Sequence, residues 1–150
     1  MKILKYTLLI LLIYIPQSLA SVCPSFLVFR SDNPVKKTTD LSSIVFIGEA
    51  VSVTRKTFRA KGYEEQVLEI SAKFDVSETL KGSSKSSIVI EGNADGDCGC
   101  NYLFEPGVKY LVYANKHKNK YQTIICQLIM PTSNTLFSET LENIRSGQNQ

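Results

Sequence analysis

Four cysteines are the residues of this 150-residue chain with the clearest capacity for chemistry. They are Cys23, Cys98, Cys100 and Cys126. Cysteines can bind zinc as thiolates or pair as disulfides. Zinc sites built from cysteine usually carry paired C-x-x-C knuckles, and this spacing lacks them. The choice between the two roles therefore depends on the compartment in which the protein resides, because disulfides persist in oxidising compartments.

Other residues offer little for catalysis or metal binding. His117 is the only histidine and lies in the lysine-rich segment "NKHKNK", where we expect a solvated loop residue. Asp95 and Asp97 resemble the start of a calcium loop, but no bidentate glutamate follows at the required spacing. The chain shows no Ser/His/Asp or Cys/His set and no phosphate-binding glycine loop. The sequence therefore predicts no enzyme activity, no intrinsic metal and no cofactor.

Residues 1–20 have the features of a secretory signal peptide. Lys2 and Lys5 precede the apolar run Thr7–Ile15, and the small residues of "SLA" at 18–20 suit signal peptidase. The run is shorter than the roughly 20 apolar residues of a membrane-spanning helix. We expect cleavage after position 20 and a secreted protein, extracellular or periplasmic.

Residues 21–150 then form a chain of single-domain size. The signal holds two of the 17 basic residues and none of the 14 acidic ones, so its removal lowers the net charge from +3 to +1. This balance gives no electrostatic argument for a nucleic-acid or membrane partner. Four cysteines in an exported domain predict two disulfides.

Alternating apolar residues predict the strands that must position these cysteines. Residues 68–76 alternate with period two, which indicates a half-buried strand. The segment "SSIVFIGEAVSV" (42–53) is apolar on both faces, as in a central barrel strand, and Gly48 is expected to mark a bulge or bend. "SSIVIEG" is a further short strand. The turn "EPG" leads into "VKYLVYA", which "NKHKNK" joins to "YQTIICQLI" as a hairpin.

The C-terminal segment predicts a helix. Phe137, Leu141 and Ile144 recur at helical spacing, and Ser133 or Asn134 is the expected N-cap. About five short antiparallel strands and one helix favour a mainly β fold, a small five-stranded Greek-key barrel.

The order of these landmarks resembles the tissue inhibitors of metalloproteinases and the wider family of netrin-like modules. The landmarks are Cys-Pro near the mature start, "SSIVFIGEAVSV", "LKG", "DCG", "PGVKYLVYA", "TIIC" and a terminal helix. The resemblance covers nearly all of Ser21 to Arg145. It implies a five-stranded OB-type barrel with helices, in agreement with the strand count reached from the residues.

The resemblance also implies a function at the mature N-terminus. In inhibitory members a first cysteine chelates the protease's catalytic zinc through its α-amino group and carbonyl oxygen. The next side chain enters the adjacent specificity pocket. Here Ser21 falls on the first cysteine, Val22 on the pocket residue and Cys23 on the second cysteine. Because Ser21 cannot form a disulfide, Cys23 must anchor this end of the chain.

The family's disulfides join the first cysteine to the "CG" cysteine, matched by Cys98, and the second to the late cysteine, matched by Cys126. Four cysteines allow three connectivities, and two of them are compared by their geometry. Cys23–Cys126 with Cys98–Cys100 keeps one family bridge but closes a cramped ring across one residue. Cys23–Cys98 with Cys100–Cys126 avoids that ring and is favoured on disulfide geometry.

The resemblance leaves two readings besides inhibition. The first is a non-inhibitory netrin-like module that binds another extracellular protein. The second is an oligonucleotide-binding barrel, with "KHKNK" as basic patch and Tyr110, Tyr113 and Tyr121 as a stacking surface. That patch lacks interleaved aromatics, and tyrosines in strands are ordinary packing residues. We therefore expect a protein partner, a zinc metalloprotease or another extracellular protein, and no nucleic acid.

Overall fold

A computed structural model of the chain describes residue 28 and residues 30–59, 66–92, 102–123 and 128–147. The helices and strands follow one another in the order α3, β1, β2, β3, β4, β5, β6, α4. Their bounds are Pro34–Leu41 (α3), Ile44–Arg59 (β1), Gln66–Lys81 (β2), Ser87–Glu91 (β3), Lys109–His117 (β4), Lys120–Gln122 (β5), Met130–Pro131 (β6) and Phe137–Gly147 (α4).

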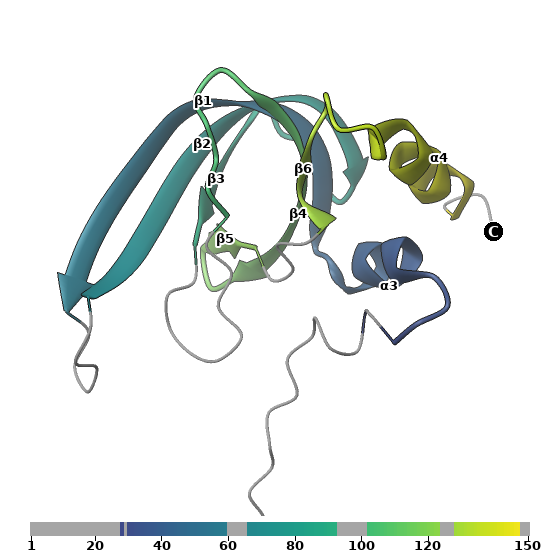
Figure 1. The fold of residues 1–150 in the computed structure, drawn as a ribbon, viewed down its shortest axis with the longest axis horizontal. Helices are drawn as coiled ribbons and strands as arrows, with labels where there is room; N and C mark the ends of the chain where they lie inside the picture. Colours follow the sequence, from purple (N-terminus) through teal and green to yellow (C-terminus); the bar gives the residue numbers. More distant parts are fainter. Residues whose placement is uncertain (1–27, 29, 60–65, 93–101, 124–127, 148–150) are drawn as a thin grey trace, which may run out of the picture.

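Five of the strands close into a ring (Figure 1). Strand β1 pairs antiparallel with β2 on one side and with β4 on the other. Strand β2 pairs antiparallel with β3, β3 parallel with β5, and β5 antiparallel with β4. Strand β6 pairs antiparallel with Tyr110 and Leu111 of β4, along the edge of β4 opposite β1. The domain is mainly β, with a closed five-stranded ring and a C-terminal helix, which confirms this part of the prediction.

The interior of the ring is an apolar core rich in aromatic side chains. Phe74 lies at its centre and makes edge-to-face contacts with Phe46 at 5.5 Å and Phe104 at 5.0 Å between ring centroids. Such pairs are worth about 0.5–1.5 kcal/mol beyond the area they bury. The alternation in β2 explains this placement, because Ile70, Ala72 and Phe74 are buried while the residues between them are more exposed.

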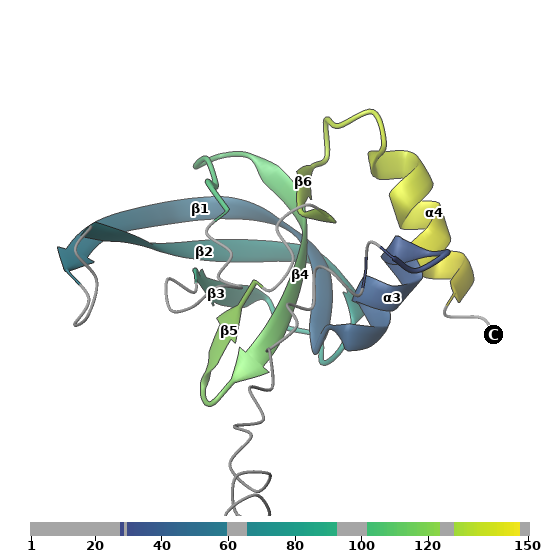
Figure 2. The ribbon, with the colours of Figure 1, turned by 60° about the horizontal axis from the view of Figure 1, so that its bottom comes forward.

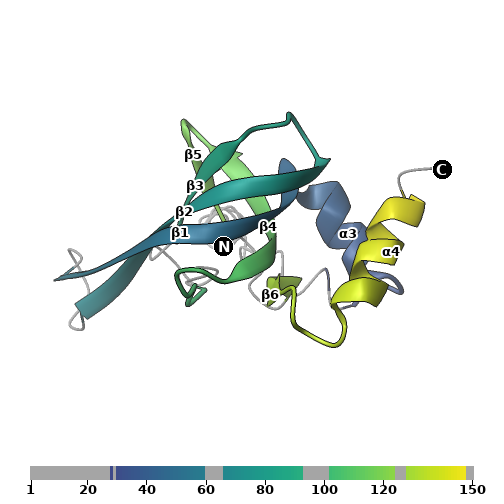
Figure 3. The ribbon, with the colours of Figure 1, turned by 90° about the horizontal axis from the view of Figure 1, so that it is seen from above.

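A second core lies outside the ring, between its wall and the two helices. It contains Val45 and Ile47 of β1 with Leu111 and Tyr113 of β4, and Ile144 of α4 packs against them. Residues 44–48 of β1 and 110–114 of β4 are therefore buried on both faces, which explains why these two stretches contain no charged residue. Figure 3 shows α3 and α4 side by side at this end of the sheet.

Strands β1 and β2 extend past the ring at the opposite end (Figure 2). Their ladder shifts register between Ile47 and Gly48 and again between Ala50 and Ser52. These irregularities confirm the bend expected at Gly48. Pairing of β2 with β3 ends at Ser71, so among the described strands residues 55–59 and 66–70 form a ladder only with each other, and the Ile70 carbonyl in addition accepts from the Gly92 N–H. We call this two-stranded ribbon the β1–β2 arm.

Two elements were absent from the sequence prediction. Helix α3 begins at an Asn33–Pro34 pair, and the Asn33 side-chain oxygen accepts a hydrogen bond from the backbone N–H of Lys36 at 2.9 Å. An asparagine N-cap followed by proline is a strong start signal for a helix. Strand β6 has only two residues, too few for any periodicity.

The C-terminal helix starts later than its predicted cap. Helix α4 begins at Phe137, and Asn134 instead accepts a hydrogen bond from the backbone N–H of Leu136 at 2.9 Å in the turn before it. The predicted inward face is confirmed, because Phe137, Leu141 and Ile144 all pack into the second core.

Candidate functional site

The residues predicted to contact a protease or to form disulfides lie outside the part of the chain that the structure describes. These are the N-terminal Ser21, Val22 and Cys23, and the cysteines Cys98, Cys100 and Cys126, with both alternative disulfide pairings. Asp95 and Asp97 lie outside it as well. The described residues nevertheless fix the positions at which these segments leave the ring.

Two cysteine-bearing segments leave the ring from neighbouring positions. Strands β3 and β5 run parallel, with Ile90 beside Tyr121 and Glu91 beside Gln122. Parallel strands end at the same edge, so the segment toward Cys98 and the segment toward Cys126 start side by side. We call this place the cysteine edge and define it by Glu91, Gly92, Gln122 and Thr123.

The residues that follow β3 and β5 at the cysteine edge are both held against the ring. The Gly92 N–H donates to the Ile70 carbonyl of β2 at 2.6 Å. Thr123 is buried. In the sequence, Cys98 follows Gly92 by six residues and Cys126 follows Thr123 by three.

The segment that carries Cys98 and Cys100 returns to the ring at Tyr102. The Tyr102 ring lies 4.8 Å from Phe104 and 5.7 Å from Tyr110, between centroids. The Tyr110 hydroxyl accepts a hydrogen bond from the backbone N–H of Glu105 at 3.0 Å, which holds the following Pro106–Gly107 turn. Burial is the main cause that raises the pKa of Tyr102, and the neighbouring Tyr110 and Glu105 add to it. At neutral pH the Tyr102 hydroxyl is therefore uncharged, and its ring serves as a packing surface.

One ion pair lies beside the cysteine edge. The Lys120 ammonium contacts the Glu91 carboxylate at 2.7 Å, and this hydrogen bond is the main cause that raises the pKa of Lys120. The pair lines a shallow depression of about 250 Å³ together with Lys56 and Glu69. Charges of both signs alternate across this surface, and nothing in the sequence pattern pointed to it, because its residues come from four separate strands.

The start of the described chain limits how far the N-terminal segment reaches. Val28 is fully buried, and its carbonyl accepts a hydrogen bond from the Ser31 N–H at 3.0 Å. Ser21 precedes Val28 by seven residues. A fully extended chain of that length spans at most about 25 Å, which bounds the distance between Ser21 and Val28.

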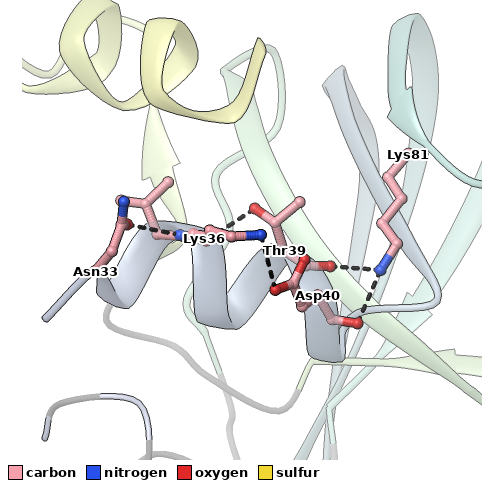
Figure 4. A network of polar contacts seen from close by, with 6 residues as sticks. Asn33, Lys36, Thr39, Asp40 and Lys81 are labelled. Carbon is pink, nitrogen blue, oxygen red and sulfur yellow. Dashed lines mark hydrogen bonds and ion pairs between the residues drawn. The ribbon is translucent and has the colours of Figure 1, made fainter. Parts of the chain in front are cut away.

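A cleft of about 210 Å³ lies between α3 and α4, and none of the residues predicted to contact a protease or to form disulfides lines it. Figure 4 shows the polar contacts of four residues that line it, Lys36, Thr39, Asp40 and Lys81. The Lys81 ammonium of β2 donates to the carbonyl oxygens of Thr39 and Asp40 at 2.6 and 2.9 Å. Lys36 pairs with Asp40 at 3.3 Å. A cation at a helix C-terminus is favourable, so these groups satisfy one another and fasten α3 to the ring.

The remaining candidates from the sequence are structural or exposed. His117 ends β4 and is exposed beside the hairpin turn, as expected. Tyr110 and Tyr113 are buried, and Tyr121 packs partly against the inner core, which confirms their assignment to packing. Among the described residues, no three His, Cys, Asp or Glu side chains gather in a way that would hold a metal ion.

The chain matches no protein-family model, and no curated protein matches it. Within the described residues, neither helix is long and apolar enough to cross a membrane.

Proposed function

We propose that residues 21–150 form an exported netrin-like domain that inhibits a zinc metalloendopeptidase through its mature N-terminus. After removal of residues 1–20, the α-amino nitrogen and carbonyl oxygen of Ser21 chelate the zinc of the protease. Val22 enters the adjacent specificity pocket, and Cys23 anchors the segment. A neutral amine and a carbonyl fill the open coordination position of a catalytic zinc and displace its water. The domain itself needs no cofactor and catalyses no reaction.

The observation that carries this proposal is the parallel pairing of β3 with β5. It sends the segments of Cys98 and Cys126 out from neighbouring positions. Both proposed disulfides can then form at the cysteine edge, where the disulfide of Cys23 also holds the N-terminal segment. The closed ring with a C-terminal helix also suits the fold that the family resemblance implies.

The same topology supports a finer proposal on the architecture. We propose that the ring is an OB-type Greek-key barrel stapled by Cys23–Cys98 and Cys100–Cys126. The alternative, Cys23–Cys126 with Cys98–Cys100, closes a ring across one residue, which strains a disulfide. Peptide mapping of the unreduced protein distinguishes the two pairings, because only the alternative pairing joins Cys98 to Cys100 within one short peptide.

The inhibitory proposal is tested at the first residue. The mass of the exported protein must correspond to a chain that starts at Ser21, and this protein is then titrated against a panel of zinc endopeptidases. One alanine inserted before Ser21 moves the amine away from the zinc and is expected to weaken inhibition at least tenfold. One alanine added after Gln150 is the matched control and leaves inhibition unchanged. A different mature start, or equal inhibition by both extended proteins, overturns the proposal.

A second function has one observation in its favour. The β1–β2 arm extends beyond the ring, and Lys56 and Thr57 on it are exposed, whereas the Arg55 guanidinium donates to the Phe104 carbonyl at 3.1 Å. A projecting ribbon with an exposed charge suits a module that binds another extracellular protein without inhibiting a protease. Replacing Lys56 by glutamate would then weaken binding of that partner, whereas the alanine inserted before Ser21 would leave it unchanged.

A further inference from the structure

Strand β3 has a free edge over most of its length. Its ladder with β2 joins all of Ser87–Glu91 to residues 71–75. Its ladder with β5 joins only Ile90 to Tyr121 and Glu91 to Gln122. Among the described residues, Ser87–Val89 therefore have a paired strand on one side only.

The backbone polar groups of Ser87 and Val89 face this free edge. On the side of β2, the Ser86 carbonyl accepts from Val76 N–H at 2.9 Å and the Gly92 N–H donates to the Ile70 carbonyl at 2.6 Å. Successive residues of an antiparallel strand direct their N–H and C=O groups to opposite sides. Even-numbered residues of β3 thus face β2, and Ser87 and Val89 face away from it.

A groove of about 400 Å³ runs along this edge. Ser87 and Val89 line one wall, and Asn119, Lys120 and Tyr121 of the β4–β5 hairpin line the other. Val89 is 45% exposed, so its side chain is open to a ligand. The groove therefore combines unpaired backbone groups with an exposed apolar side chain, the two features that an incoming strand uses.

The rim of the groove is basic. The Lys85 ammonium lies 5.8 Å from the centre of the Tyr121 ring, and Lys116 and Lys118 are exposed on the adjoining hairpin. Glu91 is the one acidic residue that lines the groove, and its charge is compensated by Lys120 at 2.7 Å. A ligand that supplies carboxylates is therefore complementary in charge.

We propose that this edge binds an extended acidic segment of a partner protein as an additional strand. The segment pairs with the backbone of Ser87 and Val89, as in other cases of strand addition. Its side chains alternate in direction, so apolar residues pack beside Val89 on the exposed face while acidic residues meet Lys85 on the face of Tyr121. A second copy of this chain is disfavoured as the occupant because it would bring two basic hairpins together. The proposal does not depend on zinc chelation by Ser21.

The test uses the full exported protein and a labelled peptide of sequence VEVDVE. Fluorescence anisotropy measures its affinity against two comparison peptides, one scrambled into a block of valines and a block of acids, and one N-methylated at alternate residues. N-methylation removes the donors along one edge and keeps every charge. We expect it to weaken binding about 25-fold, since it removes the donors to the Ser87 and Val89 carbonyls and each lost hydrogen bond costs about a factor of five.

Two pairs of variants locate the site. Val89→Pro removes a backbone donor that faces the groove and spares the ladder with β2, so we expect about fivefold weaker binding; Val89→Ala keeps the donor and controls for the side chain. Lys85→Glu is expected to weaken binding about tenfold, whereas Lys37→Glu, the same charge change on exposed α3, leaves it unchanged. Thermal melting of each variant verifies that it is folded.

Three outcomes overturn the proposal. The first is equal affinity for the N-methylated peptide, which shows a contact by charge alone. The second is unchanged binding by Val89→Pro. The third is a dimer in sedimentation that Val89→Pro dissociates, which assigns the edge to a second copy of the chain.

Discussion

At the scale of single residues, Gly48 occupies a position with no room for a side chain. A Cβ atom there would lie 2.8 Å from the Asp75 carbonyl oxygen and 3.2 Å from Cε2 of Phe46. The backbone of β2 and a core ring would both have to move. We therefore expect Gly48→Ala to lower the free energy of unfolding by about 1–3 kcal/mol, measured by urea denaturation. Gly147→Ala, with nothing within 4 Å of the new atom, is the control, and equal effects of the two substitutions would contradict this explanation.

The Tyr113 hydroxyl is buried and has no partner at hydrogen-bonding geometry among the described residues. It faces Thr39, whose own hydroxyl donates to the Val35 carbonyl at 2.8 Å. Removing an unsatisfied buried hydroxyl avoids its desolvation cost. Tyr113→Phe is therefore expected to raise the free energy of unfolding by about 1 kcal/mol in chemical denaturation. A decrease of that size would show instead that Thr39 accepts a hydrogen bond from it.

Burial also raises the pKa of Tyr113, and the weaker effect of Thr39 opposes it. Its pKa is then higher in the folded protein than in the unfolded chain, where it is about 10. The raised pKa contributes fully to the free energy of unfolding below pH about 10. This contribution is lost as the pH rises above that value, because Tyr113 loses its proton first in the unfolded chain. We expect the melting temperature to fall above pH 10 and to fall less steeply in Tyr113→Phe. Parallel curves for the two proteins would contradict this assignment.

At the scale of elements, one lysine of β2 joins the C-terminal end of α3 to the ring. Lys81 donates to two carbonyl oxygens at the C-terminal end of the helix, and these are the groups that a helix leaves without partners. Lys81→Met keeps the length of the side chain and removes the donor. We expect a loss of about 1 kcal/mol in the free energy of unfolding.

Lys36→Met is the matched control for this prediction. It removes an exposed ion pair with Asp40, which is expected to contribute only a few tenths of a kcal/mol. Hydrogen exchange of the α3 amides should accelerate in the Lys81 variant only. Equal exchange in both variants would show that the helix is held by its packing against α4 rather than by Lys81.

The elements also show what the sequence was able to predict. Strand β2 was predictable because it alternates strictly from Leu68 to Val76, and β1 because β-branched residues fill both of its faces. Helix α3 was missed because Thr38 and Thr39 are buried on it, so its inner face is polar and has no apolar period. The remaining sequence signal for this helix was the Asn33–Pro34 pair at its N-terminus.

The surface around the cysteine edge was beyond the reach of sequence patterns. Lys120 and Glu91 are 29 residues apart in the chain, and only the parallel pairing of β3 with β5 brings them together. The order of strands around a ring is set by long-range contacts. Local periodicity carries no information about such contacts, whereas it does indicate that the strands exist.

At the scale of the whole molecule, stability is expected to depend on the cysteines. A bridge from Cys23 to Cys98 closes a loop of about 75 residues, which the chain-entropy model equates with roughly 4 kcal/mol. The double variant Cys23→Ser/Cys98→Ser is expected to lose about this amount and to keep one bridge. Cys23→Ser/Cys126→Ser leaves Cys98 and Cys100 as unmatched neighbours and is expected to lose more. The reverse order of stability in thermal melting would favour the alternative pairing.

The antiparallel seam between β1 and β4, which closes the ring, bears on the order in which this domain is expected to fold. The ladders of β1 with β2 and of β2 with β3 join neighbouring segments, whereas this seam joins residues 44–49 to residues 109–114. Contacts between distant residues carry a larger entropy cost of loop closure and form late. We therefore expect the hairpins to assemble while the ring is still open, and the pairing of β1 with β4 to form last. A chaperone, or a neighbouring unfolded chain, has its best opportunity to intercept the protein at this seam.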